Sequence, residues 1–340
     1  AVDIECEMLV LGAGPGGYSA AFRSADLGMK TVLVERYATL GGVCLNVGCI
    51  PSKALLHVTS LLDETAHLAD CGVSFAAPKV DIDRLRAHKA GVVAKLTGGL
   101  AGMAKMRKVN VVHGTAKFAG SHEVTVTDDK GATQTIPFKQ CIIAAGSRSV
   151  KLPFMPQDDR IIDSTGALSL PEIPERLAVI GGGVIGVEFA SLYSMLGTQV
   201  TVIEMLPEIV PFADDDVAAQ LRKALKDVTF KLGCRVTSID GGKVNWTTAD
   251  GAEENVEADC VLMAVGRRPA VDGWGAENAG LEYSGRGVVV DDRMRTNLPN
   301  VWAIGDVTGR SLLAHAAYRM GEIAAANICD PEASTHGEVM

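Results

Sequence analysis

The sequence predicts an α/β fold with two Rossmann-like dinucleotide-binding domains, each a three-layer ββα unit, the second inserted in the first. Two observations lead to this prediction. A glycine-rich turn after a short apolar stretch occurs twice, at residues 12–17 and 181–186. Around each turn the segments follow one order: an apolar strand, the turn, a helical pattern, and a second strand that ends in glutamate.

The first repeat begins with an apolar strand at 8–11, which runs directly into Gly12-Ala13-Gly14-Pro15-Gly16-Gly17. A helical pattern follows at 18–27, and the next strand, 31–34, ends at Glu35. The glycines suit a tight turn, close approach of a pyrophosphate and packing of helix on strand. The glutamate is placed for the ribose hydroxyls of an adenosine.

The second repeat has the same parts: a strand at 177–180, the turn Gly181-Gly182-Gly183-Val184-Ile185-Gly186, and a helix ending near Leu196. Its second strand, 199–203, ends at Glu204. In both repeats the glutamate lies 23 positions after the first glycine. Two turns in register, each with strand, helix and terminal acid, indicate two nucleotide sites rather than two flexible loops.

Two further apolar strands end in glycine, within 140–147 and 259–267, as expected where the chain crosses between domains. Alternating stretches at 123–126 and 244–247 predict hairpin strands inserted in each repeat. The predicted layout is a first domain formed by 1–150 and 271–330, a second domain at 151–270, and a tail at 331–340.

The composition is typical of a soluble globular chain: 47% of the 340 residues are hydrophobic and 21% are charged, with a net charge of −9. The negative charge argues against a nucleic-acid binder, which carries a basic surface. No apolar stretch approaches the ~20 residues that span a bilayer, and the N-terminus lacks the pattern of a secretory signal. We therefore expect a cytoplasmic protein with no membrane or nucleic-acid partner.

Two of the eight cysteines, Cys44 and Cys49, are separated by four residues within the segment 41–53. Two such thiols can exchange an electron pair as a dithiol and a disulfide. A zinc site is disfavoured because no second pair or nearby histidine completes it, so no metal is expected. The other cysteines lie in apolar or strand-like stretches and are expected to be buried: Cys6, Cys71, Cys141, Cys234, Cys260 and Cys329.

Together these residues resemble the flavoprotein disulfide reductases, and within that family the dihydrolipoamide dehydrogenases of 2-oxo-acid dehydrogenase complexes. The resemblance extends from Val10 to about Asn327, and its most specific part, 41–53, is close to the family's signature. It implies FAD and NAD as cofactors. It also implies oxidation of a dihydrolipoyl dithiol by NAD⁺, with a lipoyl domain of an acyltransferase as the partner.

The resemblance implies that the first repeat holds the ADP half of FAD and the second holds NAD. It further implies that Asp306 accepts a hydrogen bond from a ribityl hydroxyl, and that the helix starting at Ala314 faces the flavin pyrimidine edge. The implied FAD contacts are Gly12, Gly14, Pro15, Gly16, Gly17, Glu35, Arg36, Gly42, Val43, Lys53, Ala116, Ala145, Gly146, Ser147, Asp306 and Ala314. The implied NAD contacts are Gly181, Gly183, Val184, Ile185, Gly186, Glu204, Val236 and Gly266.

Glu204 also predicts NAD rather than NADP, because a carboxylate there binds the ribose 2′-hydroxyl and repels a 2′-phosphate. The residues that follow, Met205-Leu206-Pro207-Glu208, offer no arginine for such a phosphate. In the implied relay Cys44 exchanges with substrate and Cys49 lies against the flavin. A helix predicted to begin just past Cys49 favours its thiolate. Lys53, paired with Glu188, would sit near the hydride-accepting nitrogen.

The family's His-Pro-x-x-x-Glu base pattern is not reproduced by His336 and Glu338, and His315 is interpreted as structural. The dimerisation domain is absent from the match, so the family's homodimer is not assumed. For this chain we expect retained FAD binding with little dihydrolipoamide turnover, while NADH oxidation by an artificial acceptor survives. The alternatives are another disulfide reductase, acting on glutathione or mercuric ion, and a flavin-bearing binding or scaffold protein.

Overall fold

The computed structural model describes residue 4 and residues 6–332, which form two compact units. The first unit is formed by the described residues up to 46, by 93–148 and by 267–332. The second unit is drawn from 47–92 and 149–266. Each unit contains one glycine-turn repeat and is described by itself.

The first unit is organised around a five-stranded parallel sheet in the order β20-β7-β1-β2-β3. Its register places Leu9 opposite Val32 on one side and Cys141 on the other. The sheet strands are β1 (Met8–Leu11), β2 (Thr31–Glu35), β3 (Asn110–His113), β7 (Gln140–Ile143) and β20 (Val301–Ala303). The smaller strands are β4 (Thr115–Gly120), β5 (Glu123–Thr127), β6 (Thr133–Pro137), β8 (Ser147–Ser149), β17 (Arg267–Pro269), β18 (Tyr283–Ser284) and β19 (Gly287–Val288).

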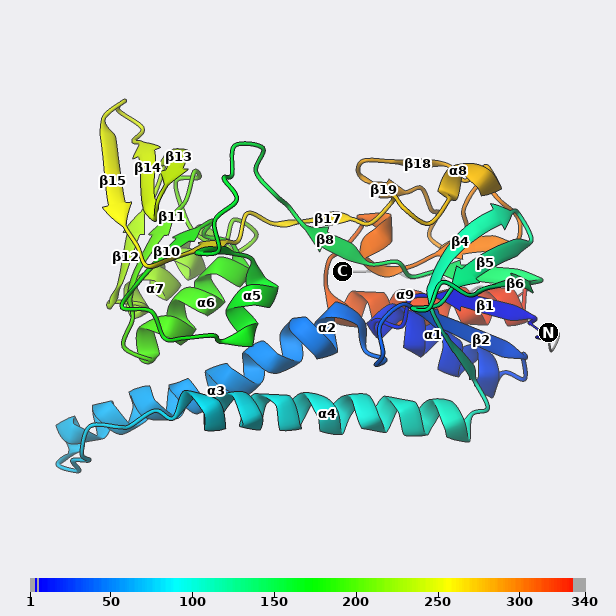
Figure 1. Ribbon diagram of the computed structural model, residues 1–340, viewed down its shortest axis with the longest axis horizontal. Coiled ribbons are helices and arrows are strands. Elements are labelled where there is room, and N and C mark those ends of the chain that lie inside the picture. Colours follow the sequence, from blue (N-terminus) through cyan, green and yellow to red (C-terminus); the bar gives the residue numbers. More distant parts are fainter. Residues whose placement is uncertain (1–3, 5, 333–340) are drawn as a thin grey trace. The chain divides into compact units, whose positions relative to one another are not determined.

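Two layers cover this sheet, which explains why its strands are apolar on both faces. Leu9 and Leu11 share a buried cluster with Phe118 and Val124 of the three-stranded sheet β4-β5-β6. On the helical side α1 lies against β1 and β2, and α9 lies against α1 (Figure 1). The helices of this unit are α1 (Pro15–Asp26), α8 (Ala276–Ala279), the 3-10 turn η2 (Gly305–Thr308) and α9 (Ala314–Cys329).

The second unit repeats this plan with a five-stranded sheet in the order β12-β11-β10-β16-β9. The strands are β9 (Ile161–Ile162), β10 (Arg176–Ile180), β11 (Gln199–Ile203), β12 (Val228–Lys231), β13 (Arg235–Asp240), β14 (Lys243–Thr247), β15 (Glu253–Glu257) and β16 (Cys260–Met263). The helices are α3 (Cys49–His67), the 3-10 turn η1 (Leu68–Cys71), α5 (Ser164–Ser169), α6 (Val184–Met195) and α7 (Asp215–Ala224). The limits between the units fall inside two helices, α2 (Gly42–Val47) and α4 (Ile82–Met106), so part of each helix belongs to each unit.

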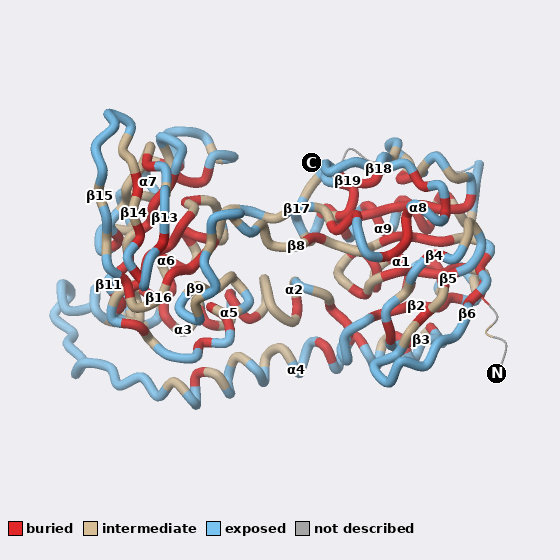
Figure 2. Tube along the Cα trace, turned by 45° about the horizontal axis from the view of Figure 1, so that its top comes forward, coloured by how far each residue is buried: buried red, intermediate tan, exposed pale blue. Residues whose placement is uncertain are grey.

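Alternation along β10 distributes its side chains between two cores. Ile180 packs with Trp246 of the three-stranded sheet β13-β14-β15. Val179 points to the other face and joins a cluster with Phe189 of α6 and Leu55 of α3. Figure 2 shows buried residues concentrated in the central strands of each unit. Both repeats therefore form the three-layer ββα arrangement that the sequence predicts.

The structure departs from the predicted layout over residues 47–92. The prediction assigned this segment to the first domain, whereas it clusters with the second unit. The reason is packing, because Leu55 and Leu85 lie in the same apolar cluster as Phe189. The other unit limits, 148/149 and 266/267, fall a few residues from the predicted limits of 150 and 270. Which nucleotide each unit binds stays a prediction.

Two local expectations are corrected. The helix predicted to start just past Cys49 begins at Cys49 itself, with Gly48 preceding it as N-cap. Of the six cysteines expected to be buried, Cys71 is exposed, while Cys260 and Cys329 are only half-buried. Cys71 is the last residue of the 3-10 turn η1, whose residues are all exposed. Within the described part of the chain, the helices are too short or too polar to cross a membrane.

Candidate active site

The first glycine turn is possible only because of its missing side chains. Gly12 has a φ of +96°, and a Cβ there would lie 2.3 Å from the carbonyl oxygen of Ala144. A Cβ on Gly17 would lie 1.7 Å from the carbonyl oxygen of Gly12. These contacts bring α1 directly against the end of β1, as a dinucleotide-binding turn requires.

The second turn repeats these contacts at equivalent positions. Gly181 has a φ of +107°, and its Cβ would lie 2.3 Å from the carbonyl oxygen of Ala264. A Cβ on Gly186 would lie 2.0 Å from the carbonyl oxygen of Gly181. Gly183 differs, because a Cβ there would meet open space among the described residues. That open position is where a nucleotide pyrophosphate approaches the backbone in such turns.

The two terminal glutamates are held in the same way. Glu35 Oε2 accepts from Ala13 N at 2.8 Å and its Oε1 accepts from Tyr37 N at 3.0 Å. Glu204 Oε2 accepts from Gly182 N at 2.5 Å and its Oε1 accepts from Leu206 N at 2.7 Å. A carboxylate has about four lone-pair sites, so each glutamate keeps capacity to accept from two ribose hydroxyls.

The helices that follow the turns offer their N-termini to an anion. α1 begins after Gly14 and α6 after Gly183, in both cases with no side-chain cap and no acidic residue in the first turn. The unpaired backbone N–H groups and the helix dipole therefore face the turn, which suits a pyrophosphate. Each turn therefore has an open helix N-terminus and a hydrogen-bonded glutamate, and both sites fit a dinucleotide such as FAD or NAD.

The loop after β2 closes over the first turn. A Cβ on Gly42 would lie 2.5 Å from Gly14 Cα, so backbone passes directly over backbone here. Gly42 has a φ of +59°, which also favours glycine. Beside it, Val43 is exposed, and the guanidinium of Arg36 lies 4.7 Å from the ring centre of Tyr37. This loop carries the chain from the first turn into the cysteine segment.

Asp306 lies at the start of η2, after strand β20, and belongs to a hydrogen-bonded group. Ser147 Oγ donates to Asp306 Oδ2 at 2.6 Å. Burial raises the pKa of Asp306, while the Ser147 hydrogen bond and the charge of Arg267 lower it. α9 begins at Ala314, as predicted, with no side-chain cap and no acidic residue in its first turn. The first unit therefore has an oriented carboxylate and an open helix N-terminus in addition to its glycine turn.

The two cysteines of the redox segment lie on successive helices. Cys44 is on the short helix α2, and Cys49 is the first residue of α3, a helix of 19 residues. Both side chains are half-buried. α3 has no acidic residue in its first turn. The start of a helix favours the thiolate form of a cysteine, and the thiolate is the reactive form.

Other cysteines have surroundings that suppress this reactivity. Burial raises the pKa of Cys6 to about 12 and the pKa of Cys260 to about 11. Burial also raises the pKa of Cys141. These thiols stay protonated near neutral pH and are poor nucleophiles.

Lys53 and Glu188 connect α3 to α6 within the second unit. Lys53 Nζ lies 2.5 Å from Glu188 Oε1, the pairing that the family resemblance implies. The Lys53 side chain is 59% exposed and the Glu188 side chain 30%. The ammonium therefore lies one helical turn from Cys49 and remains accessible.

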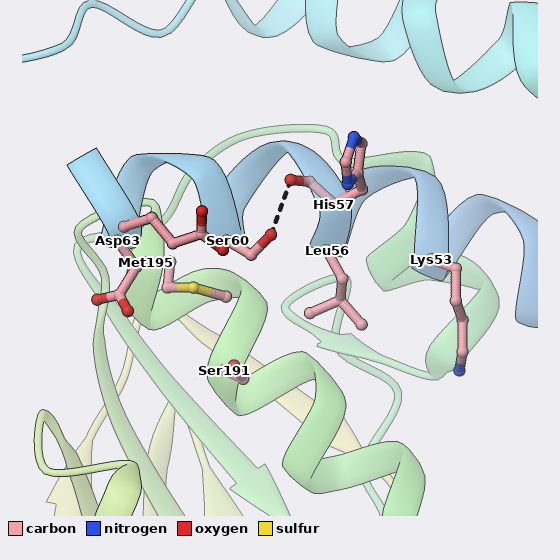
Figure 3. Close-up of a pocket in the computed structure, with 8 residues that line it drawn as sticks. Lys53, Leu56, His57, Ser60, Asp63, Ser191 and Met195 are labelled. Carbon is pink, nitrogen blue, oxygen red and sulfur yellow. Dashed lines mark hydrogen bonds between the residues drawn. The ribbon is translucent and has the colours of Figure 1, made fainter.

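An open groove of about 490 Å³ runs between the same two helices. In Figure 3 Leu56 points from α3 toward α6, which carries Ser191 and Met195, whereas His57 points away. The groove is lined by Lys53, Leu56, His57, Ser60, Asp63, Glu64, Ser191 and Met195.

The remaining predicted residues are scattered along strand ends. Ala116 is half-buried on β4, and Val236 is half-buried on β13 next to a β-bulge. Gly146 and Gly266 both have positive φ, at +75° and +107°. The other predicted contacts lie in the same turns and helix starts: Pro15 and Gly16, Val184 and Ile185, and Ala145. His315 is exposed, and His336 and Glu338 lie outside the described residues.

Arg267 is a polar group that the sequence analysis did not select. Its guanidinium donates to Ser147 through two nitrogens, from β17 to β8. The sequence pattern that could have identified Arg267 is that a polar residue follows the glycine at the end of both strands, at 140–147 and 259–267. In the described part of the chain, no three His, Cys, Asp or Glu side chains are grouped to hold a metal ion.

Comparison with known proteins agrees with this geometry. The sequence profile described as "Pyridine nucleotide-disulphide oxidoreductase" matches residues 6–321. Dihydrolipoyl dehydrogenase of Vibrio cholerae is 49% identical over 330 residues, which cover 95% of this chain and 69% of that protein. Dihydrolipoyl dehydrogenase of Bacillus subtilis is 45% identical over 330 residues, covering 95% of this chain and 70% of that protein.

Solved structures give the same result. A Cu(II) complex of the HOCl-induced flavoprotein disulfide reductase RclA from Escherichia coli superposes with a TM-score of 0.83 at 30% identity, covering 95% of this chain and 71% of that chain. This family uses FAD and NAD(H), which are the cofactors that the two glycine turns fit. The chain therefore belongs to the pyridine nucleotide-disulphide oxidoreductase family and is an oxidoreductase of that family.

Proposed function

We propose that this chain oxidises a protein-bound dihydrolipoyl dithiol with NAD⁺, at the low turnover expected without the family's base pattern. Its relatives in Vibrio cholerae and Bacillus subtilis are named for this activity. One observation carries the proposal. A cysteine pair on two successive helices, with Cys49 as the first residue of the second, follows the first of two glutamate-terminated dinucleotide turns. That combination couples dithiol exchange to nucleotide redox chemistry.

The residues that would hold FAD are those of the first turn, with Glu35 toward the ribose and Asp306 toward the ribityl chain. The residues that would hold NAD are those of the second turn, with Glu204 toward the ribose. Bound FAD supplies the two-electron chemistry that links a dithiol to a nicotinamide. The protein supplies placement, charge and thiol exchange.

The thiol exchange is a pair of substitutions at sulfur. A dihydrolipoyl thiolate attacks Cys44 Sγ of the oxidised pair, forming a mixed disulfide and releasing Cys49 as a thiolate. The second substrate thiolate then attacks the substrate sulfur of this mixed disulfide and releases Cys44 as a thiolate. The substrate ends as a cyclic disulfide and the cysteine pair as a dithiol, so two electrons have moved onto the protein.

Two features of α3 suit the released thiolate. Cys49 is its first residue, where the helix dipole favours negative charge. Lys53 places an ammonium group one turn later, held at 2.5 Å by Glu188 of α6. A good leaving thiolate speeds exchange, which is what this position provides.

The same proposal includes the nicotinamide, the partner and the compartment. Glu204 favours NAD, because its buried carboxylate would repel a 2′-phosphate. The partner is the lipoyl domain of an acyltransferase in a 2-oxo-acid dehydrogenase complex. The compartment is the cytoplasm, where cysteine pairs of this kind are catalytic rather than structural.

The test is anaerobic reduction of the oxidised, FAD-loaded chain by dihydrolipoamide, with reduced glutathione as the matched thiol. We expect dihydrolipoamide to produce two new protein thiols per chain and glutathione to produce none at equal thiol concentration. Cys71→Ser, which alters an exposed cysteine, should react like the unmodified chain. Equal reduction by glutathione would assign the chain to another branch of the family.

A further inference from the structure

The side chain of Arg267 makes two hydrogen bonds to Ser147. β17, which begins at Arg267, pairs with β8, which begins at Ser147. Arg267 Nε donates to Ser147 Oγ at 2.9 Å, and Arg267 Nη2 donates to the Ser147 carbonyl oxygen at 2.9 Å. Two bonds from one planar guanidinium fix both the backbone and the side chain of the serine.

These bonds determine where the serine proton goes. A guanidinium can only donate, so Ser147 Oγ must accept from Arg267. The single hydroxyl proton is then available for Asp306 Oδ2, which lies 2.6 Å away. Arg267, Ser147 and Asp306 thus form a directed chain of hydrogen bonds.

The environment makes this direction matter. Ser147 is only 8% exposed, and Asp306 is half-buried on η2. Burial raises the pKa of Asp306, and the Ser147 hydrogen bond and the Arg267 charge act against that rise. Of the elements packed on η2, β19 (Gly287–Val288) has no titratable side chain, α9 presents the exposed His315 in its first turn, and β17 brings Arg267.

We propose that Arg267 is a positioning residue for the flavin cofactor: through Ser147 it holds the Asp306 carboxylate as an oriented acceptor for a ribityl hydroxyl. Arg267 can act in this way only if Asp306 contacts FAD, as proposed above. The guanidinium itself need not touch the cofactor. Its contribution is to keep one carboxylate oxygen occupied and the group negatively charged.

The experiment measures the FAD dissociation constant of the deflavinated chain by flavin fluorescence, from pH 5.5 to pH 9. We expect Arg267→Met to weaken FAD binding roughly 10- to 100-fold, the effect of losing hydrogen bonds to a charged group. Ser147→Ala should weaken it to a similar degree. The double variant should bind FAD with the affinity of the weaker-binding single variant, because the arginine and the serine act on the same carboxylate.

The pH profile separates positioning from a structural role. FAD affinity should fall as Asp306 becomes protonated, and Arg267→Met should move that fall to higher pH. The matched control is Arg148→Met on β8, the strand of Ser147, because Arg148 pairs with Asp272 at 3.3 Å. It should leave both the affinity and the profile unchanged. Retained NADH binding shows that the second unit of each variant is folded, and an unchanged circular dichroism spectrum shows the same for the first unit, which carries the substitutions.

Asp306→Asn distinguishes the two levels of the proposal. If Asp306→Asn weakens FAD binding and Arg267→Met does not, the positioning role of Arg267 is wrong while Asp306 keeps its proposed role. If Asp306→Asn binds FAD as tightly as the unmodified chain, the role of Asp306 fails first. Additive losses in the double variant with an unshifted pH profile would also overturn the proposal.

Discussion

Lys53 Nζ lies 2.5 Å from Glu188 Oε1 and joins the helix that starts at Cys49 to the helix that follows the second glycine turn. The pair is substantially exposed, with 59% of the lysine and 30% of the glutamate side chain accessible. Exposed ion pairs contribute little to stability. The pair is therefore better explained by the placement of the lysine charge than by the energy of folding.

Glu188→Gln tests that explanation. The variant should lower the free energy of unfolding by less than ~1 kcal/mol, measured by urea denaturation. The rate of NADH reduction of the FAD-loaded chain should nevertheless fall, because the ammonium is no longer fixed beside the thiolate. Asp63→Asn is the control, since Asp63 pairs with His67 on the same helix. A large stability loss with unchanged reduction rate would make the pair structural.

Gly183 and Gly186 allow stability and nucleotide binding to be separated. Gly186→Ala places a Cβ 2.0 Å from the Gly181 carbonyl oxygen and should destabilise the chain by at least ~2 kcal/mol. Gly183→Ala meets open space, and its φ of −71° and ψ of −179° suit alanine. That variant should unfold at the same temperature and bind NADH at least ~10-fold more weakly. Unchanged NADH affinity in Gly183→Ala would place the pyrophosphate elsewhere.

Glu204→Gln should change the choice between nicotinamides. The variant removes the negative charge that faces the ribose, so the preference for NADH over NADPH should fall by roughly 10-fold or more. Glu208→Gln is the matched control on the same loop, because Glu208 pairs with Arg222 at 2.9 Å. The ratio of the two dissociation constants is the measurement. A ratio that stays the same in Glu204→Gln contradicts the assigned role.

The raised pKa of Asp306 predicts opposite effects on the empty and the loaded protein. Because burial raises the pKa above its ordinary value of 3.8, the group lowers the stability of the folded chain as the pH rises from 3.8 to the raised pKa, and the full loss is present above it. Asp306→Asn should therefore raise the melting temperature of the deflavinated chain at pH 7. The gain should fade as the pH falls through the raised pKa and should vanish below pH 3.8, where aspartate is neutral in both states.

FAD affinity should decrease in the same variant. Asp292→Asn serves as the control, because Asp292 is exposed and pairs with Arg310 at 2.7 Å. It should alter neither quantity. Lower stability of Asp306→Asn at pH 7 would mean that the carboxylate is favourable in the empty protein.

The sequence was most informative where chemistry depends on neighbours in the chain. Gly12 with Gly17, and Gly181 with Gly186, predicted both turns, because spacing alone sets those contacts. The pairing of Lys53 with Glu188 spans 135 residues and came only from family resemblance. Spacing could not supply it, since many exposed charges would fit either partner.

Long-range polar contacts and packing of amphipathic helices were not predictable. Arg267 and Ser147 are 120 residues apart, and their contact depends on β8 pairing with β17. Leu55 and Leu85 read as ordinary apolar positions that could face either unit. Only the packing shows that they join the core of the second unit.

The most direct test of the central claim is anaerobic titration of the FAD-loaded chain with NADH, followed by visible absorbance. A relay in which Cys49 lies against the flavin predicts a long-wavelength charge-transfer band after transfer of two electrons. Cys49→Ser should abolish the band, and Cys44→Ser should retain it. Bleaching of the flavin with no such band in the unmodified chain would contradict the account.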